Sequence, residues 1–300
     1  MNGDRAWRFD QLRAGADEPP PASTDRHDRL FPFLRNFDPY AGHSWASGHA
    51  KFGEGNNNES SSEAVNAWYG LILLGEAVGD KTLRDLGVWL LTTEVAAIDD
   101  YWFDVTGKFH HPDYPASVVT MVWGGKGANG TWFSDEPELI HGINWLPITG
   151  ATLYLGRHPD YCAANYAALV AEKRERESRQ PAKSGAGREK GIHWNHWADL
   201  IWMYRALSDP RDALAQFQAR PTNFRPEAGN SLANAYTWIA ALDELGQVDR
   251  AVTADTPYYA VFQKAGRRTH VAYNMGAAPR TVTFSDGVSV LCPPRSFGLK

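Results

Sequence analysis

The segment from Asn58 to Gly79 constrains the fold most, because its apolar residues form two helical stripes instead of one. Val65, Trp68 and Ile72 fall on one face, and Leu71, Leu74 and Val78 on another. Asn58 is a plausible N-cap of this helix and Gly79 a plausible C-cap. A helix that is apolar on two faces packs on two sides, as in layered helical assemblies, instead of lying on a surface.

The rest of the chain continues this helical pattern until about residue 250. Further helices are predicted at 80–98, 138–155, 159–179, 192–208, 210–218 and 231–246, with an exposed loop at 180–191. Residues 1–30 are polar and proline-rich and are predicted to be a poorly ordered lead-in. Short β-branched or aromatic runs at 258–263, 269–274, 281–284 and 288–291 predict a small antiparallel sheet with a hairpin turn at 285–287. The sequence therefore predicts a mainly α protein, with a helical region at 31–250 and a β tail at 255–300.

Composition excludes several classes of function. The formal net charge of −5 gives no basic face for nucleic acid. No apolar run approaches the roughly 18 residues of a membrane span, and residues 1–10 do not resemble a secretory signal. No histidine and cysteine cluster has zinc spacing, and neither an EF-hand loop nor a nucleotide-binding glycine motif is present, so no metal or cofactor is expected. Cys162 and Cys292 could form a disulfide, but the spacing does not support one, and the redox compartment stays open.

The chain is rich in aromatic residues, with 12 Trp, 12 Tyr and 13 Phe among its 300 residues. Most are expected in the core, where aromatic rings bury large areas. Trp45, Trp123 and Trp132 lie instead in loops rich in glycine and asparagine, where either packing or stacking against the apolar face of a sugar would explain them.

The densest polar segment carries a pair of carboxylates, Glu59 and Glu63. A helix that begins near Asn58 would place both on one face, with Glu59 in the first turn where the helix dipole favours an anion. A capping acidic residue with a solvated neighbour would give the same spacing. The surrounding asparagines and serines, and the buried helix that follows, favour a carbohydrate site at the mouth of a helical barrel. Glycoside hydrolysis uses two carboxyl groups, an acid and a base.

Several stretches resemble glycoside hydrolase family 81, the inverting endo-β-1,3-glucanases. They are FPFLRNFDPYAGHSWASG (31–48), NNNESSSEAVNAWYGLILLGEAVGD (56–80), LLTTEVAAIDDYW (90–102), MVWGGK (121–126), TWFS (131–134), IHGINWLPIT (140–149), EAGNSLANAYTWIAALDELG (227–246), VAYN (271–274) and VTFSDG (282–287). The resemblance implies part of an (α/α)6 toroid followed by the short β tail. It implies β-1,3-glucan as substrate, no membrane insertion, and a place outside the cell or at the cell wall.

The resemblance also implies roles for individual residues. Glu59 would be the general base that activates water, and Glu63 its essential partner, the two titrating as a coupled pair. Residues expected to contact the sugar are Asp38, His43, Trp45, Trp123, Trp132 and His141.

One element of the family pattern is missing from this sequence. The general acid of the family lies in a stretch of the form DHHFHYG, which does not occur here. An inverting enzyme places its acid and base about 6.5–9.5 Å apart across the sugar, which two carboxylates on one helix face cannot do. We therefore expect the acid on an upstream segment. The alternatives are a catalytically impaired glucan-binding fragment and a toroid enzyme for another polysaccharide.

Overall fold

The computed structural model describes residues 33–34, 36–46, 52–179 and 192–300. It divides into two compact units, each described separately below. The first unit comprises Met1–Thr152 and Ala168–His196, and the second comprises Leu153–Ala167 and Trp197–Lys300. The predicted lead-in at 1–30 and the predicted loop at 180–191 lie outside the described residues.

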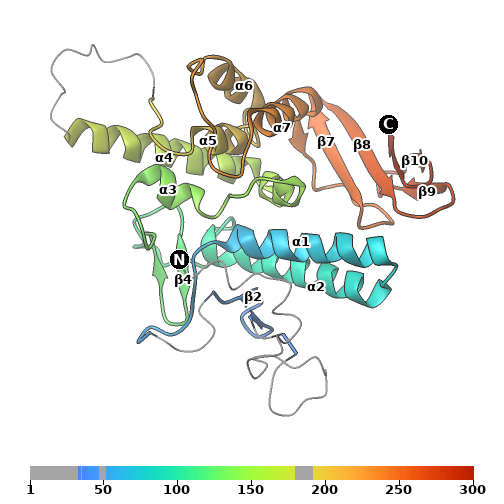
Figure 1. Cartoon of the computed structure of the whole chain (residues 1–300), viewed down its shortest axis with the longest axis horizontal. Helices are drawn as coiled ribbons and strands as arrows, with labels where there is room; N and C mark the ends of the chain where they lie inside the picture. The colour runs from blue at the N-terminus through green and yellow to red at the C-terminus, as the bar shows by residue number, and fades with distance from the viewer. Residues whose placement is uncertain (1–32, 35, 47–51, 180–191) are drawn as a thin grey trace. The chain divides into compact units, whose positions relative to one another are not determined.

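Two antiparallel helices, α1 (Ser61–Val78) and α2 (Lys81–Ala97), are the centre of the first unit (Figure 1). They are joined at Gly79, which has a left-handed backbone (φ 72°) suited to glycine. Asp80 caps α2 by accepting a hydrogen bond from the backbone N–H of Leu83, so the chain reverses within two residues. A buried cluster lies under these helices and consists of Phe37, Ala64, Trp68, Leu71 and Leu90.

The first helix differs from its prediction in two respects. It begins at Ser61, because Asn58 belongs to a strand and does not cap the helix. The stripe predicted from Leu71, Leu74 and Val78 is not buried throughout, since Leu74 is 43% and Val78 64% exposed, whereas Leu71 is buried. The prediction of two fully buried faces is therefore wrong for the last two turns of α1.

Glycines allow α1 and α2 to approach closely. A Cβ atom built on Gly75 would lie 2.5 Å from the backbone nitrogen of Arg84, and one on Gly87 would lie 2.9 Å from Cγ1 of Ile72. The clash at Gly75 is with backbone, so it could be relieved only by moving the helices apart.

We expect Gly75→Ala to destabilise the protein by about 1–3 kcal/mol, the usual range for overpacking. Helix propensity alone would favour alanine by about 1 kcal/mol, so the clash decides the sign. Urea unfolding should be compared with Gly53→Ala, because a Cβ at Gly53 has no atom within 4 Å. Equal stability of the two variants would refute the close approach.

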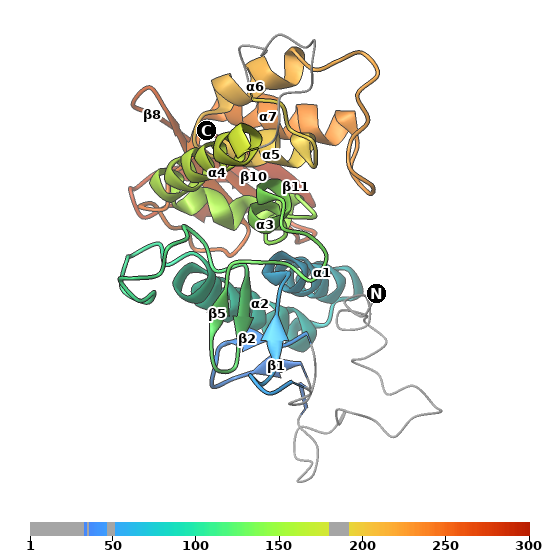
Figure 2. The same cartoon turned by 90° about the vertical axis from the view of Figure 1, so that its left-hand side faces the viewer.

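The first unit also contains short strands, of which Figure 2 shows β1, β2 and β5 on one side of the helical pair. β1 (Phe37–Asp38) pairs with β2 (His43–Ser44). β3 (Asn57–Asn58) pairs with β4 (Met121–Trp123), which pairs in turn with β5 (Gly127–Ala128). A π-helical turn, Ile98–Trp102, extends α2.

The helix predicted at 138–155 is broken. Its first part is α3 (Pro137–Gly142), and a 3₁₀ helix follows at Gly150–Arg157. Pro147 lies between them, and proline has no N–H to continue a helical hydrogen-bond ladder. α4 (Pro159–Arg179) agrees with its predicted range, and its residues 159–167 belong to the second unit and 168–179 to the first.

The second unit combines helices with most of the β structure. Besides residues 159–167 of α4, it contains the helices α5 (Ala198–Arg205), α6 (Pro210–Gln218) and α7 (Leu232–Leu245). α6 has its predicted range, α7 is one residue shorter than predicted at each end, and α5 starts six residues later than predicted. The unit thus groups α5 to α7 with the strands, whereas the sequence-based division separates a helical region, 31–250, from the tail.

The predicted β tail is present and antiparallel. One sheet has the order β11–β8–β7–β6, and β9 and β10 form a separate hairpin. The strands are β6 (Gln247–Val248), β7 (Tyr259–Lys264), β8 (Arg267–Asn274), β9 (Arg280–Thr283), β10 (Ser289–Cys292) and β11 (Ser296–Leu299). The hairpin turn predicted at 285–287 is confirmed, with Gly287 at φ 87°.

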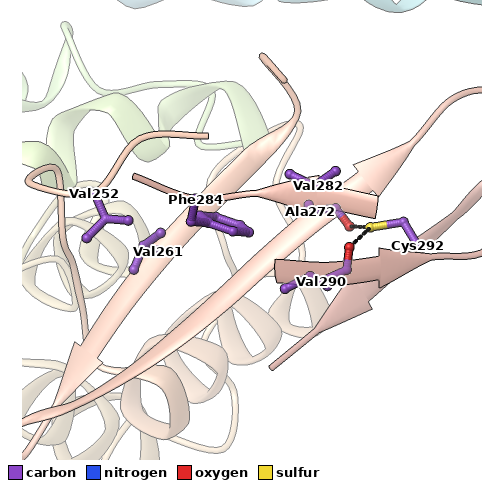
Figure 3. Close-up of a cluster of buried hydrophobic side chains, with 7 residues drawn as sticks. All are labelled: Val252, Val261, Ala272, Val282, Phe284, Val290 and Cys292. Atoms are coloured by element: carbon purple, nitrogen blue, oxygen red, sulfur yellow. Dashed lines mark hydrogen bonds between the residues drawn. The ribbon is translucent and has the colours of Figure 1, made fainter. Parts of the chain in front are cut away.

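Both cysteines of the chain are buried free thiols, and one of them lies in the core of the β tail. Figure 3 shows the buried cluster of Val252, Val261, Ala272, Val282, Phe284, Val290 and Cys292. Cys292 is a buried free thiol that donates to the carbonyl of Ala272 at 3.4 Å. Cys162 is likewise free and buried and donates to the carbonyl of Leu155. The two cysteines therefore do not form the disulfide that the sequence left open.

Candidate active site

Glu59 lies in the bend between β3 and α1, not in the first turn of a helix. Its carboxylate oxygen Oε1 accepts a hydrogen bond of 2.9 Å from the backbone N–H of Trp132. Burial raises the pKa of Glu59, and the hydrogen bond from Trp132 opposes this by lowering it. The result is a partly buried carboxylate that is fixed through one oxygen and has a stronger affinity for protons than an exposed glutamate.

Glu63 lies in the first turn of α1, where its backbone N–H donates to the carbonyl of Ser60 at 3.0 Å. The prediction that Glu59 and Glu63 lie on successive turns of one helix is therefore wrong, because Glu59 lies in a bend and only Glu63 lies in the helix. The partnership between Glu63 and Glu59 stays a prediction.

A cluster of three aromatic rings lies next to Glu59. The ring centroids of Phe52, Trp123 and Trp132 are each 5.5 Å from one another. Trp123 pairs with Asn57 between β4 and β3, and Asn57 lies two residues before Glu59 in the sequence. The backbone amide of Trp132 binds the Glu59 carboxylate. The Trp132 side chain is 56% exposed. Two of the predicted stacking residues thus contact each other beside the predicted base, and exposed ring surface is available for an apolar sugar face.

A second group brings together Asp38, His43 and Trp45. Asp38 and His43 are opposite each other in the β1–β2 pair, and the Trp45 indole N–H donates to Oδ2 of Asp38 at 3.1 Å. The His43 ring lies 4.3 Å from the ring of Trp45 and 5.0 Å from that of Trp102. The sequence-predicted sugar contacts of this loop therefore form one cluster.

Asp38 and His43, the two titratable side chains of this second group, both have pKa values below their ordinary values. Burial works to raise the pKa of Asp38, but the hydrogen bond from Trp45 and those from the Ala41 and Tyr40 amides lower it below the ordinary value. Burial lowers the pKa of His43, so the ring is neutral near pH 7. His43 Nδ1 lies 2.9 Å from the carbonyl oxygen of Ser44, which can only accept, so Nδ1 carries the hydrogen and Nε2 is an acceptor.

Hydrogen bonds connect the second group to the bend that carries Glu59. The side-chain amide of Asn58 donates to the carbonyl of Ser44 at 2.8 Å, and the backbone N–H of Ala46 donates to the carbonyl of Asn57 at 2.8 Å. The strand segment after His43 consequently lies beside the residues just before Glu59. All of these residues belong to the first unit.

The start of α1 is held by a residue far away in sequence. Asn144 is completely buried, and its Oδ1 accepts from both the backbone N–H and the hydroxyl of Ser61, at 3.0 and 2.8 Å. Its amide nitrogen donates to the carbonyl of Thr120. Asn144 therefore provides the capping contact that the helix does not receive from its own N-cap residue, Ser60.

His141 is placed differently from the other predicted contacts. It has no exposed surface, and its Nε2 lies 3.0 Å from Oε2 of Glu172 on α4. The structure gives it a buried contact between α3 and α4, and its role in binding substrate stays a prediction. Within the described ranges, no group of three or more His, Cys, Asp or Glu side chains could hold a metal ion.

Sequence reasoning missed three residues of this region: Phe52, Glu94 and Asn144. Glu94 had a detectable signal, because it shares a helical stripe with Leu90 and Ile98, all three of which are fully buried. An ionisable residue on a buried stripe requires polar partners. Asn144 gave no local signal, since its partners are 24 and 83 residues away.

A partly buried carboxylate beside clustered aromatic rings, one of them exposed, is typical of proteins that act on polysaccharides, which need a proton acceptor and flat apolar surfaces. The comparisons specify the family. The model of the "Glycosyl hydrolase family 81 C-terminal domain" matches residues 20–239. The chain belongs to glycoside hydrolase family 81.

Relatives and a solved structure agree with this assignment. The chain is 48% identical over 278 residues to a glucan endo-1,3-beta-D-glucosidase of Acetivibrio thermocellus, covering 93% of this chain and 34% of the relative. It is 47% identical over 270 residues to one of Thermobifida fusca, covering 90% and 33%. A mutant of the family 81 glycoside hydrolase from Clostridium thermocellum has a similar structure, with a TM-score of 0.81 at 47% identity, covering 93% of this chain and 36% of that chain. The chain thus spans about a third of the length of these relatives.

Proposed function

We propose that this chain contributes the general-base side of an inverting endo-β-1,3-glucanase, with Glu59 as the base and Glu63 as its partner. The observation that supports this most strongly is the position of Glu59, which is partly buried, fixed by the Trp132 amide and adjacent to the aromatic cluster. The names of the relatives, glucan endo-1,3-beta-D-glucosidases, indicate the bond that would be cleaved.

The geometry suggests how Glu59 would act. The Trp132 amide occupies Oε1, and we assign Oε2 to the water that attacks the anomeric carbon. The raised pKa makes the carboxylate a better proton acceptor than an exposed glutamate. Trp123 and Trp132 would stack on glucose rings, and the cluster of Asp38, His43 and Trp45 would bind sugar hydroxyls.

The acid side of the reaction requires a carboxyl group on the opposite side of the sugar, about 6.5–9.5 Å from the base. The sequence contains no DHHFHYG stretch, so we propose that a further segment supplies this group and completes an (α/α)6 toroid. A place outside the cell or at the wall fits such a substrate, and one relative, from Schizosaccharomyces pombe, is named a primary septum glucan endo-1,3-beta-D-glucosidase. None of the described helices is long and apolar enough to cross a membrane.

The second candidate is a glucan-binding fragment with impaired catalysis. The exposed ring of Trp132 in the Phe52–Trp123–Trp132 cluster favours it, because stacking needs no general acid. A toroid enzyme for a uronate polymer remains the third reading.

Laminarin and polyuronate distinguish these candidates. The purified chain is incubated with each polymer, release of reducing ends is measured, and retention is followed by affinity electrophoresis. Reducing ends from laminarin alone, or hydrolysis of a laminari-oligosaccharyl β-fluoride that needs no general acid, support the glucanase. Retention of laminarin with hydrolysis of neither substrate supports the binding fragment. Cleavage of polyuronate with no effect on laminarin would overturn the assignment.

We expect Trp132→Ala to weaken binding of laminari-oligosaccharides about tenfold, which corresponds to about 1.4 kcal/mol. The substitution removes the exposed ring but keeps the backbone N–H that binds Glu59. Calorimetric titration should be run beside Phe297→Ala, which removes a ring of similar exposure (63%) from β11 in the other unit. Equal loss of affinity in both variants would contradict a stacking role for Trp132.

A further inference from the structure

We infer that Glu94 is a positioning residue for this site: it holds Ser44 in place, and through Ser44 it fixes both the orientation of His43 and the bend that presents Glu59. The inference rests on the proposed function of Glu59. Glu94 itself has no exposed surface, so it is not expected to touch substrate.

Glu94 projects from α2 and receives hydrogen bonds from two directions. The backbone N–H of Ser44 lies 3.0 Å from both carboxylate oxygens, and the Ser44 hydroxyl donates to Oε2 at 2.7 Å. The indole N–H of Trp68, on α1, donates to the same Oε2 at 3.1 Å. One carboxylate thus ties α1, α2 and β2 together.

The contacts continue from Ser44 to the site. Its carbonyl oxygen accepts from Nδ1 of His43 and from the side-chain amide of Asn58, at 2.9 and 2.8 Å. The first bond fixes the tautomer and direction of His43, and the second anchors the residue just before Glu59. Glu94 binds the N–H and the hydroxyl of Ser44 and so fixes the position of the Ser44 carbonyl. This carbonyl then accepts the hydrogen bonds from His43 and Asn58.

The chemistry of the contacts requires a carboxylate. All three partners are donors, and an ionised carboxylate offers only acceptors. A glutamine would turn an N–H₂ group toward one of these donors and lose at least one bond. Burial raises the pKa of Glu94 and its hydrogen bonds from Ser44 and Trp68 lower it, with a net value of about 7. An apolar side chain would continue the stripe of Leu90 and Ile98 without this unfavourable burial of charge. Stability alone therefore does not explain the residue, and positioning of Ser44 does.

The test compares Glu94→Gln with Trp68→Phe by amide NMR and kinetics. Glu94→Gln should speed hydrogen exchange of the Ser44 amide about tenfold and shift the Trp132 amide, which reports on the Glu59 carboxylate. Trp68→Phe removes the indole donor to the same carboxylate but leaves both Ser44 contacts, so it should lower thermal stability without shifting the Trp132 amide. Circular dichroism confirms that each variant is folded.

Kinetics provide the second readout, with a laminari-oligosaccharyl fluoride as substrate. We expect Glu94→Gln to lower kcat about tenfold with KM within twofold, and Glu94→Asp to restore part of it. An unchanged Trp132 amide in folded Glu94→Gln would overturn the inference, as would equal effects of Glu94→Gln and Trp68→Phe. If Glu59→Gln has no effect on hydrolysis, the proposed function fails, and the NMR comparison still decides whether Glu94 positions the bend.

Discussion

Glu59→Gln is expected to lower the rate of hydrolysis on the order of 10²–10⁴-fold, the usual effect of removing a general base. Glutamine keeps the size of the side chain and can still accept from the Trp132 amide, so affinity for glucan should change little. Because the base must be ionised, activity is lost as the pH falls through the pKa of Glu59. Burial raises this pKa, so the acid limb of kcat/KM should lie above the ordinary glutamate value of 4.5.

Glu175→Gln is the matched control for this substitution. Glu175 is exposed on α4 and pairs with Arg179 one turn along the same helix, so removing its charge should leave activity and stability nearly unchanged. A Glu59→Gln enzyme with more than a tenth of the original rate would contradict the assignment of Glu59 as the base.

Lys173→Met is expected to destabilise the protein by about 3–5 kcal/mol, the largest effect on stability we predict. Lys173 Nζ lies 2.6 Å from Oε1 of Glu138, and both side chains are almost completely buried. Glu138 also accepts from the backbone N–H of Asn195 at 3.2 Å, so the pair connects α3, α4 and the segment before α5. Methionine fills the space of the lysine stem but leaves the Glu138 carboxylate buried without a cation.

Urea unfolding of the single variants Lys173→Met and Glu138→Gln and of the double variant Glu138→Gln/Lys173→Met checks this explanation. The double variant removes both charges and should regain much of the lost stability, since neutral replacement of a buried pair is often tolerated. A double variant as unstable as the sum of the two single variants would show that the pair is not coupled.

Local sequence signals predicted those helices whose ends are determined locally. Asp209 caps α6 by accepting from the Asp212 amide, and Ser231 caps α7 by accepting from the Asn234 amide. Both helices lie within one residue of their predicted bounds. Gly79 ends α1 as predicted, because its left-handed conformation depends on the residue itself and not on distant contacts.

The start of α1 could not be predicted, because it depends on distant contacts. Asn58 is a good N-cap by residue type, yet its side chain donates to the carbonyl of Ser44, and Asn144 binds Ser61 instead. The motif identified Glu59 and Glu63 as the residues of interest but misplaced Glu59 on the helix. The contacts that decide this geometry join residues 14 and 83 positions apart, beyond the reach of spacing rules.

The aromatic cluster was predictable only in part. Trp123 and Trp132 stood out because tryptophan is unusual in loops rich in glycine. Phe52 did not, since its partnership with both rings depends on the pairing of β3 with β4. The burial of His141 likewise follows from α4, whose Glu172 contacts its ring nitrogen.

The most direct measurement of the central claim is proton NMR of the first sugar released from a laminari-oligosaccharyl β-fluoride. Fluoride leaves without protonation, so this substrate isolates the general-base step from any requirement for a general acid. Our expectation is that the chain releases the α-anomer, the product of inversion, and that Glu59→Gln does so on the order of 10²–10⁴ times more slowly. Release of the β-anomer, or equal rates with and without the Glu59 carboxylate, would contradict it.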